Sequence, residues 1–151
     1  MHFAVQEQII LMKNGIYGTS KIYGEIYLKT LIRFCVFFHS SLMIRTKILQ
    51  DNGMYDDYKR NEDYALYLKL YSNGFKGYIL EDILLDYRQD KESFQRKKYK
   101  DRLIEFKVRK KYFKLFKINS IKRVIYTIKP LIVGLIPKII LYNYKKLKNA
   151  R

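Results

Sequence analysis

The chain has 151 residues, of which 48% are hydrophobic and 16% aromatic, so it is long enough to bury a core of its own. Its single cysteine, Cys35, excludes an internal disulfide. Cys35 lies in an apolar run, where a small buried hydrophobic residue is expected in preference to a nucleophile. The first residues lack the basic and long apolar segments of a signal peptide, so secretion is not expected.

The formal net charge of +17 is confined to one end of the chain. Residues 1–90 contain 11 Lys and Arg and 11 Asp and Glu, whereas residues 91–151 contain 20 and 3. This change in composition predicts a neutral packed module over residues 1–90 and a basic amphipathic helical tail over residues 91–151. A tail of that charge favours an anionic partner, either a membrane surface or a nucleic acid.

The first half of the chain gives several local predictions. Apolar residues spaced among glutamines predict a short amphipathic helix over residues 3–13, ended by Asn14-Gly15. A second helix is expected from Tyr23 to Arg33. The aromatic and β-branched content of Val36 to Arg45 predicts a strand, although His39, Ser40 and Ser41 interrupt it. A short turn of helix is then expected over Thr46 to Gln50, followed by a loop at Asp51 to Gly53.

Asp56 and Asp57 are adjacent carboxylates in the next loop. Hard cations such as Mg²⁺ and Mn²⁺ favour carboxylate ligands, so the pair invites a metal site. Two adjacent carboxylates alone are more typical of a solvated loop. We therefore assign no metal ligand in this chain.

The segment from Asn61 to Arg88 carries the most consistent local signals. Asn61 is a suitable N-cap, Glu62 and Asp63 place carboxylates in the first turn, and Gly74 follows as a stop, so a helix is expected from about residue 62 to 73. Two apolar-rich runs, residues 75–80 and 83–88, predict two short strands separated by a turn.

The same segment resembles the C-terminal half of family 2 glycosyltransferases of the GT-A type, and the resemblance covers about residues 36–90. Those enzymes carry a Glu-Asp pair opening a helix, then spaced apolar, aromatic and basic residues, and later a strand ending in Tyr-Arg. The matching residues are Glu62, Asp63, Leu66, Tyr67, Lys69, Gly74, Phe75, Leu84, Tyr87 and Arg88. Lys69 stands where the family usually has Arg, and it lacks the planar fork of that side chain.

The resemblance implies an α/β fold, here an α+β fragment that is mainly helical with a few short strands and is followed by the basic tail. It implies that Asp63 is the catalytic base, that Glu62 orients its neighbours, and that Lys69 and Arg88 bind phosphate or acceptor. His39 lies in a His-Ser element that resembles the acceptor side of the family. A lone His beside serines is also typical of a hydrogen-bonded structural residue, and both interpretations stay open.

The implied activity is transfer of a sugar from a nucleotide diphosphate to a glycan or lipid-linked acceptor in bacterial-type surface polysaccharide synthesis. The family's nucleotide-binding half and its Asp-x-Asp metal motif have no counterpart here. The resemblance therefore implies part of a longer enzyme, inactive alone, with Mg²⁺ or Mn²⁺ expected only with the other half. The alternative is a non-enzymatic basic module that binds membrane or nucleic acid, of which nucleic acid is the less expected partner.

The basic tail shows aromatic residues at near-helical spacing from Tyr99 to Phe116, which predicts one long helix or two short ones. Asn119-Ser120 is expected to cap a further helix that Pro130 stops, and Pro137 suits the start of a last one. The apolar residues 124–142 are interrupted by Lys and Pro, so spanning is not expected. We expect a cytoplasmic protein that is peripheral at the inner face of the cell membrane, with the basic tail on anionic lipid. The alternative is a tail that packs on the rest of the enzyme and whose charge is only solvated.

Overall fold

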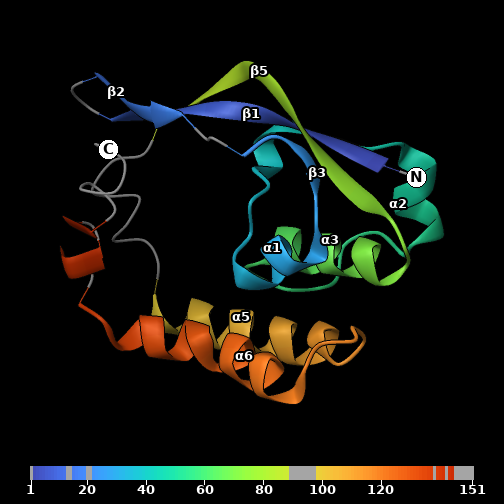
Figure 1. Cartoon of the computed structure of the whole chain (residues 1–151), viewed down its shortest axis with the longest axis vertical. Helices are drawn as coiled ribbons and strands as arrows, with labels where there is room; N and C mark the ends of the chain where they lie inside the picture. Colours follow the sequence, from blue (N-terminus) through green and yellow to red (C-terminus); the bar gives the residue numbers. More distant parts are fainter. Residues whose placement is uncertain are drawn as a thin grey trace.

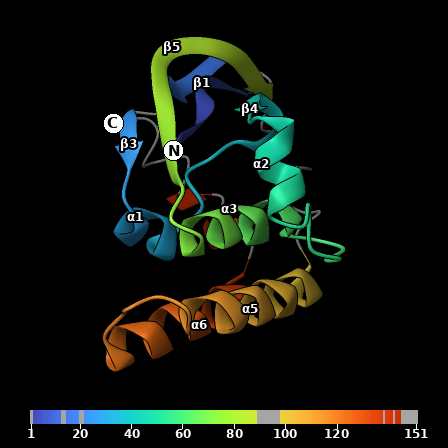
Figure 2. The same cartoon turned by 90° about the vertical axis from the view of Figure 1, so that its right-hand side faces the viewer.

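The computed structural model describes residues 2–12, 15–19, 22–88, 98–137, 139–141 and 143–144. Its fold is α+β and is arranged in layers (Figure 1). A five-stranded sheet lies over a layer that contains the helices α1 (Leu28–Arg33) and α3 (Glu62–Ser72). The helices α5 (Tyr99–Phe113) and α6 (Ser120–Leu135) form the layer on the other side of α1 and α3 (Figure 2).

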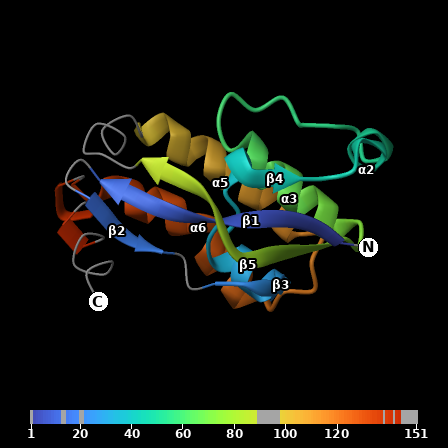
Figure 3. The same cartoon turned by 90° about the horizontal axis from the view of Figure 1, so that it is seen from above.

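The sheet is built around two long parallel strands, β1 (His2–Met12) and β5 (Lys76–Arg88), seen from above in Figure 3. Three shorter strands pair antiparallel with them: β2 (Gly15–Thr19) and β4 (Leu42–Met43) with β1, and β3 (Gly24–Ile26) with β5. The prediction of a helix over residues 3–13 is wrong, because this segment is β1. It pairs with β2, which follows it directly, with β4, and with β5 more than seventy residues away, and this pairing outweighs the weak local helical pattern.

The two strands predicted over residues 75–88 are one continuous strand. The pairing register between β1 and β5 is irregular at one point. Val5 pairs with Ile79 and Gln8 pairs with Leu85, so β5 has more residues than β1 between these two pairs. The expected turn residues Glu81 and Asp82 fall in this irregularity. An insertion of this kind bends a strand without ending it, and β5 is visibly bent in Figure 2.

Two further predictions in the first half need correction. The helix expected from residue 23 to 33 is confined to α1, because residues 24–26 form β3 and pair with residues 77–79 of β5. Most of the strand expected over residues 36–45 is absent: a 3-10 turn, η1 (His39–Ser41), precedes the two-residue β4. The Ser41 hydroxyl donates to the Phe38 carbonyl oxygen at 3.0 Å, a local bond that competes with strand pairing. The predicted short helix is confirmed as α2 (Thr46–Asp51).

The core is centred on α3, whose residues 64–68 and Leu70 are buried. Gly74 follows this helix with a φ of 84°, as expected of a helix stop. Val108, Tyr112 and Phe113 of α5 are buried in the same cluster. The change in composition near residue 90 is therefore not a boundary in packing, since α5 completes the core of the neutral module.

Helix α6 begins as predicted, because the Asn119 side chain accepts a hydrogen bond from the Ile121 backbone N–H at 3.0 Å. The prediction that Pro130 ends this helix is wrong, since α6 continues to Leu135. Pro130 has no N–H to offer the carbonyl four residues earlier, that of Tyr126. Arg109 Nη1 donates to that carbonyl oxygen at 3.1 Å and so replaces the missing bond. Among the described helices, none is long and apolar enough to cross a membrane.

Candidate active site

A cavity of about 750 Å³ opens where four segments meet. The start of α3 forms one wall, and the segment that leaves α1 forms another. Helices α5 and α6 complete it. Its lining residues are Arg33, Phe34, Cys35, Phe37, Arg60, Asn61, Glu62, Asp63, Tyr64, Asp101, Arg102, Glu105, Arg109, Lys129, Pro130 and Val133. The cavity is therefore lined by charges of both signs, with an aromatic and apolar side supplied by Phe34, Cys35 and Phe37.

Glu62 and Asp63, the predicted catalytic residues, both lie on the wall of this cavity. Glu62 is exposed and Asp63 is half-buried. The Tyr64 backbone N–H donates to Asp63 Oδ1 at 2.7 Å and fixes the carboxylate at the first turn of α3. Burial raises the pKa of Asp63 above its ordinary value of 3.8, and the Glu62 charge acts in the same direction, although the Tyr64 bond opposes both. Asp63 is thus a better proton acceptor than an exposed aspartate.

Asn61 precedes α3 as predicted but does not cap it with its side chain. Its backbone is left-handed, with φ 61° and ψ 23°, and the side chain makes no capping bond. Asn61 Nδ2 instead donates to the Asp101 carbonyl oxygen of α5 at 3.2 Å. A non-glycine residue in this conformation costs on the order of 1 kcal/mol and is held by its surroundings. Asn61 therefore ties the Glu62-Asp63 turn to α5.

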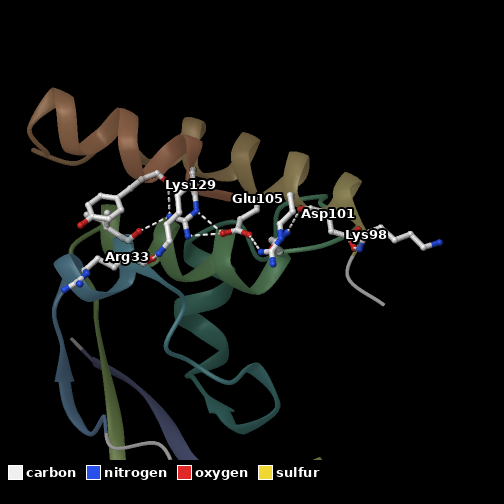
Figure 4. Close-up of polar contacts among 10 residues, drawn as sticks. Arg33, Lys98, Asp101, Glu105 and Lys129 are labelled. Atoms are coloured by element: carbon white, nitrogen blue, oxygen red, sulfur yellow. Dashed lines mark hydrogen bonds and ion pairs between the residues drawn. The ribbon is translucent and has the colours of Figure 1, made fainter. Parts of the chain in front are cut away.

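Arg109 is the centre of an ion network on the wall of the cavity, and Figure 4 draws the polar contacts of its labelled partner Glu105. Arg109 is buried, and its Nε and Nη2 lie 3.0 and 2.9 Å from Glu105 Oε1. Its Nη1 donates to the Ile32 carbonyl oxygen at 2.9 Å and to that of Tyr126. Arg102 Nη1 contacts Glu105 Oε2 at 3.0 Å. Arg109 thus joins the end of α1 to both α5 and α6.

Lys129 closes the same side of the cavity. Its Nζ donates to the Arg33 carbonyl oxygen at 2.8 Å, as Figure 4 shows. Burial lowers the pKa of Lys129, and the positive charge of Arg109 lowers it further. Sequence reasoning missed Arg109, Glu105 and Lys129 as residues of the site. The signal that was present is the Arg102, Glu105 and Arg109 spacing of three and four residues on one helix face.

His39 lies between two tyrosines. Its Nδ1 is 3.2 Å from the Tyr67 hydroxyl, and its Nε2 is 3.2 Å from that of Tyr55. The His39 and Tyr55 rings meet edge to face at a centroid distance of 5.6 Å. Both ring nitrogens therefore have partners within the protein, which agrees with the structural interpretation of His39. Contact of His39 with a substrate stays a prediction.

Lys69 is engaged in an ion cluster away from the cavity wall. Its Nζ lies 2.6 Å from Asp56 Oδ1 and donates to the Met54 carbonyl oxygen at 3.0 Å. Asp56 also accepts from Lys111 Nζ at 2.7 Å and from the Tyr112 hydroxyl at 2.6 Å. Desolvation disfavours ionised Asp56, but the Lys111, Lys69 and Tyr112 hydrogen bonds outweigh it and hold its pKa well below the ordinary value.

This cluster corrects the prediction that Asp56 and Asp57 form a solvated loop. Asp57 is exposed, but the Asp56 side chain is only 13% exposed and joins α3 to α5. The binding role predicted for Lys69 stays a prediction. Arg88 ends β5, and its side chain lies outside the described residues, so its predicted role also stays a prediction. Cys35 is exposed on the cavity wall, which corrects the expectation that it is buried.

Among the residues that the structure describes, no group of three or more His, Cys, Asp and Glu side chains could hold a metal ion. Comparisons of the chain with protein-family models, with curated proteins and with solved structures give no match. The resemblance of residues 36–90 to a glycosyltransferase family therefore depends on the spaced residues of the sequence alone.

Proposed function

We propose that this chain is the acceptor-side part of a GT-A glycosyltransferase of family 2, with Asp63 as its catalytic base. One observation carries the proposal: the Glu62-Asp63 pair opens a helix and places a carboxylate of raised pKa on the wall of a cavity of about 750 Å³. That is the position and the ionisation behaviour that a general base requires. An aspartate that served only the helix dipole would be as exposed as Glu62.

In the proposed reaction, an acceptor hydroxyl attacks the anomeric carbon of a nucleotide-diphosphate sugar. The new glycosidic C–O bond forms as the bond to the leaving diphosphate breaks, and Asp63 takes the hydroxyl proton. Glu62 orients the neighbouring groups, and the exposed Arg60 at the same wall offers a positive charge to phosphate or acceptor. The aromatic side of the cavity, which includes Phe34 and Phe37, suits the faces of a sugar ring.

The proposed reaction also requires a donor-binding half, supplied by the same polypeptide or by a second one. In this family a divalent metal held by an Asp-x-Asp motif stabilises the charge of the leaving diphosphate. The 151 residues contain no such motif. We therefore assign Mg²⁺ or Mn²⁺ to the donor-binding half and only acceptor positioning and proton transfer to this chain.

A gene-deletion comparison tests the proposed activity without assuming a donor or an acceptor. Extracts that include membranes are prepared from cells with and without the gene and are incubated with labelled nucleotide sugars and Mn²⁺ or Mg²⁺. We expect at least one donor to label a glycan or lipid product only when the gene is present. Restoring the gene should restore the label. Equal labelling from every donor in both extracts would contradict the proposal.

The alternative proposal is a non-enzymatic basic binding module. The exposed lysines of α5, such as Lys107 and Lys110, favour it, because cations on one helix suit phosphate contacts. Such a module would leave sugar labelling unchanged in the deletion comparison. It would also bind single-stranded RNA with a steep dependence on salt.

A further inference from the structure

Helix α6 presents a continuous apolar face to solvent. Ile121, Ile125, Ile132 and Leu135 are 71%, 57%, 59% and 75% exposed, and the exposed Val124 and Ile128 lie between them. Their spacing of three and four residues places all six on one face of the helix. We call these six residues the α6 stripe. Single exposed apolar residues are normal on a protein, but a contiguous stripe of this length indicates a surface with a partner.

The stripe is held outward because the opposite face of α6 is fixed to the rest of the fold. The Tyr126 carbonyl oxygen accepts a hydrogen bond from Arg109, and Lys129 donates one to Arg33 at the end of α1. Pro130 is buried. At Gly134 a Cβ would lie 2.8 Å from the Tyr99 ring, so α6 packs closely on α5 there. The helix therefore cannot turn its stripe inward without breaking these contacts. Figures 1 and 2 show α6 beside α5 in the layer that lies farthest from the sheet.

The charges around the stripe indicate the chemistry of the partner. No Asp or Glu follows Glu105 in the sequence. Lys117 and Lys122 are exposed beside the start of the stripe, and the neighbouring α5 exposes Lys107 and Lys110. Protein interfaces are depleted in lysine, whereas an anionic lipid surface attracts lysine and accepts isoleucine and leucine at the level of its acyl chains.

We propose that the α6 stripe docks on an anionic lipid surface, with α6 lying in the plane of the headgroups. The isoleucine, valine and leucine side chains enter the boundary of the acyl chains while Lys117 and Lys122 stay at the headgroup phosphates. This site is narrower than the whole basic tail predicted from the sequence, because α5 is built into the core.

This orientation also places the cavity near the lipid. Lys129, Pro130 and Val133 line the cavity from the face of α6 opposite the stripe. The thickness of one helix, about 10 Å, then separates the cavity from the headgroups. A lipid-linked acceptor suits this position. That assignment of the acceptor rests on the proposed transferase activity, whereas docking of the stripe does not.

Vesicle flotation of the full chain tests the docking without any sugar donor. The probes are vesicles of phosphatidylcholine alone and vesicles of phosphatidylcholine that contain about 30 mol% phosphatidylglycerol. We expect strong binding to the anionic vesicles and weak binding to the neutral ones. Binding should fall as salt rises from about 0.1 to 1 M, because the Debye length falls from about 10 to 3 Å.

Three double variants separate the two parts of the site. Ile125→Gln/Ile132→Gln removes two side chains of the stripe and should lower partitioning by at least about tenfold. Lys117→Gln/Lys122→Gln should lower it by about 25-fold, since each lysine near the surface is worth about fivefold. The control Tyr23→Gln/Met43→Gln changes residues of matched exposure, 60% and 64%, outside α6, and should bind as the wild type does. Circular dichroism confirms that each variant is folded.

Several results would overturn the docking proposal. These are no binding of the wild-type chain, equal binding to neutral and anionic vesicles, and unchanged binding of the Ile125→Gln/Ile132→Gln variant. Association that resists carbonate would indicate insertion and not docking. Dimers in light scattering that the Ile125→Gln/Ile132→Gln variant abolishes, with vesicles ignored, would assign the stripe to a second copy of the chain. Tight binding of single-stranded RNA with vesicles ignored would assign the charge to nucleic acid.

Discussion

Replacing Asp63 with Asn at the native locus should lower gene-dependent sugar transfer by about 10² to 10⁴-fold. The amide keeps the shape of the carboxylate and can still accept the Tyr64 N–H bond through Oδ1. It cannot take the acceptor proton. The measurement is the initial rate of labelling from the active donor in extracts of the two strains, normalised to the amount of the protein.

The control for this variant is Asp57→Asn, the same chemical change at an exposed loop position outside the cavity. It should retain wild-type transfer. Near-full turnover by the Asp63→Asn variant would reduce Asp63 to a residue that only supports the start of α3.

Stability measurements show whether Asp63→Asn loses chemistry or loses its fold. The folded-state pKa of Asp63 is raised above its ordinary value of 3.8, so the folded state binds the proton more tightly than the unfolded state. Ionising Asp63 therefore costs stability as pH rises. The Asn variant should be more stable than the wild type at neutral pH, and this gain should disappear below about pH 3.8, where Asp63 is protonated in both states.

Replacing Arg109 with Met should have the largest effect on stability, about 3 kcal/mol or more. The side chain is 3% exposed, so its removal leaves Glu105 without its closest partner and two carbonyl oxygens, of Ile32 and Tyr126, unpaired. For a chain of this size that loss lowers Tm by roughly 6–12 °C. The measurement is urea and thermal unfolding of the full chain.

Arg102→Met is the matched control, because Arg102 contacts the same carboxylate from a more exposed position. It should cost about 1 kcal/mol or less. Pro130→Ala then tests the source of the Arg109 effect. Alanine supplies the N–H that the Tyr126 carbonyl lacks, so it should recover about 1 kcal/mol more in the Arg109→Met background than in the wild type. Equal effects of Pro130→Ala in both backgrounds would contradict the role of Arg109 at this helix.

The helices with strong local signals were predictable from the sequence. Glu62 and Asp63 at one end and Gly74 at the other gave the bounds of α3, and Asn119 gave the start of α6. β1 was not predicted, because its pattern also fits a short helix and its long partner β5 is more than seventy residues away. The Asn14-Gly15 step that was interpreted as a helix stop is also a hairpin signal, and β2 follows it and pairs with β1. The prediction that Pro130 ends α6 was wrong for a related reason, because the donor that replaces the missing N–H of Pro130 comes from another helix.

The candidate site also has residues that could be predicted from the sequence and residues that could not. Glu62 and Asp63 were predictable because their spacing to the aromatic and basic residues that follow is local. The cavity wall formed by α5 was not predictable, because Arg109 bonds to Ile32, which is 77 residues away. Nothing in the sequence of the basic tail indicated that one of its charged residues would be buried. The charge pattern indicated a basic surface correctly but could not separate the residues of α5 that join the core from the exposed stripe of α6.

The pH dependence of sugar transfer tests most directly whether Asp63 is the catalytic base. We predict that kcat/KM rises with pH through an acid limb that lies above the ordinary aspartate pKa of 3.8 and then reaches a plateau. The residual activity of the Asp63→Asn variant should lack this limb, because no carboxylate at that position remains to titrate. An acid limb of the same position and slope in the wild type and in the variant would contradict the assignment.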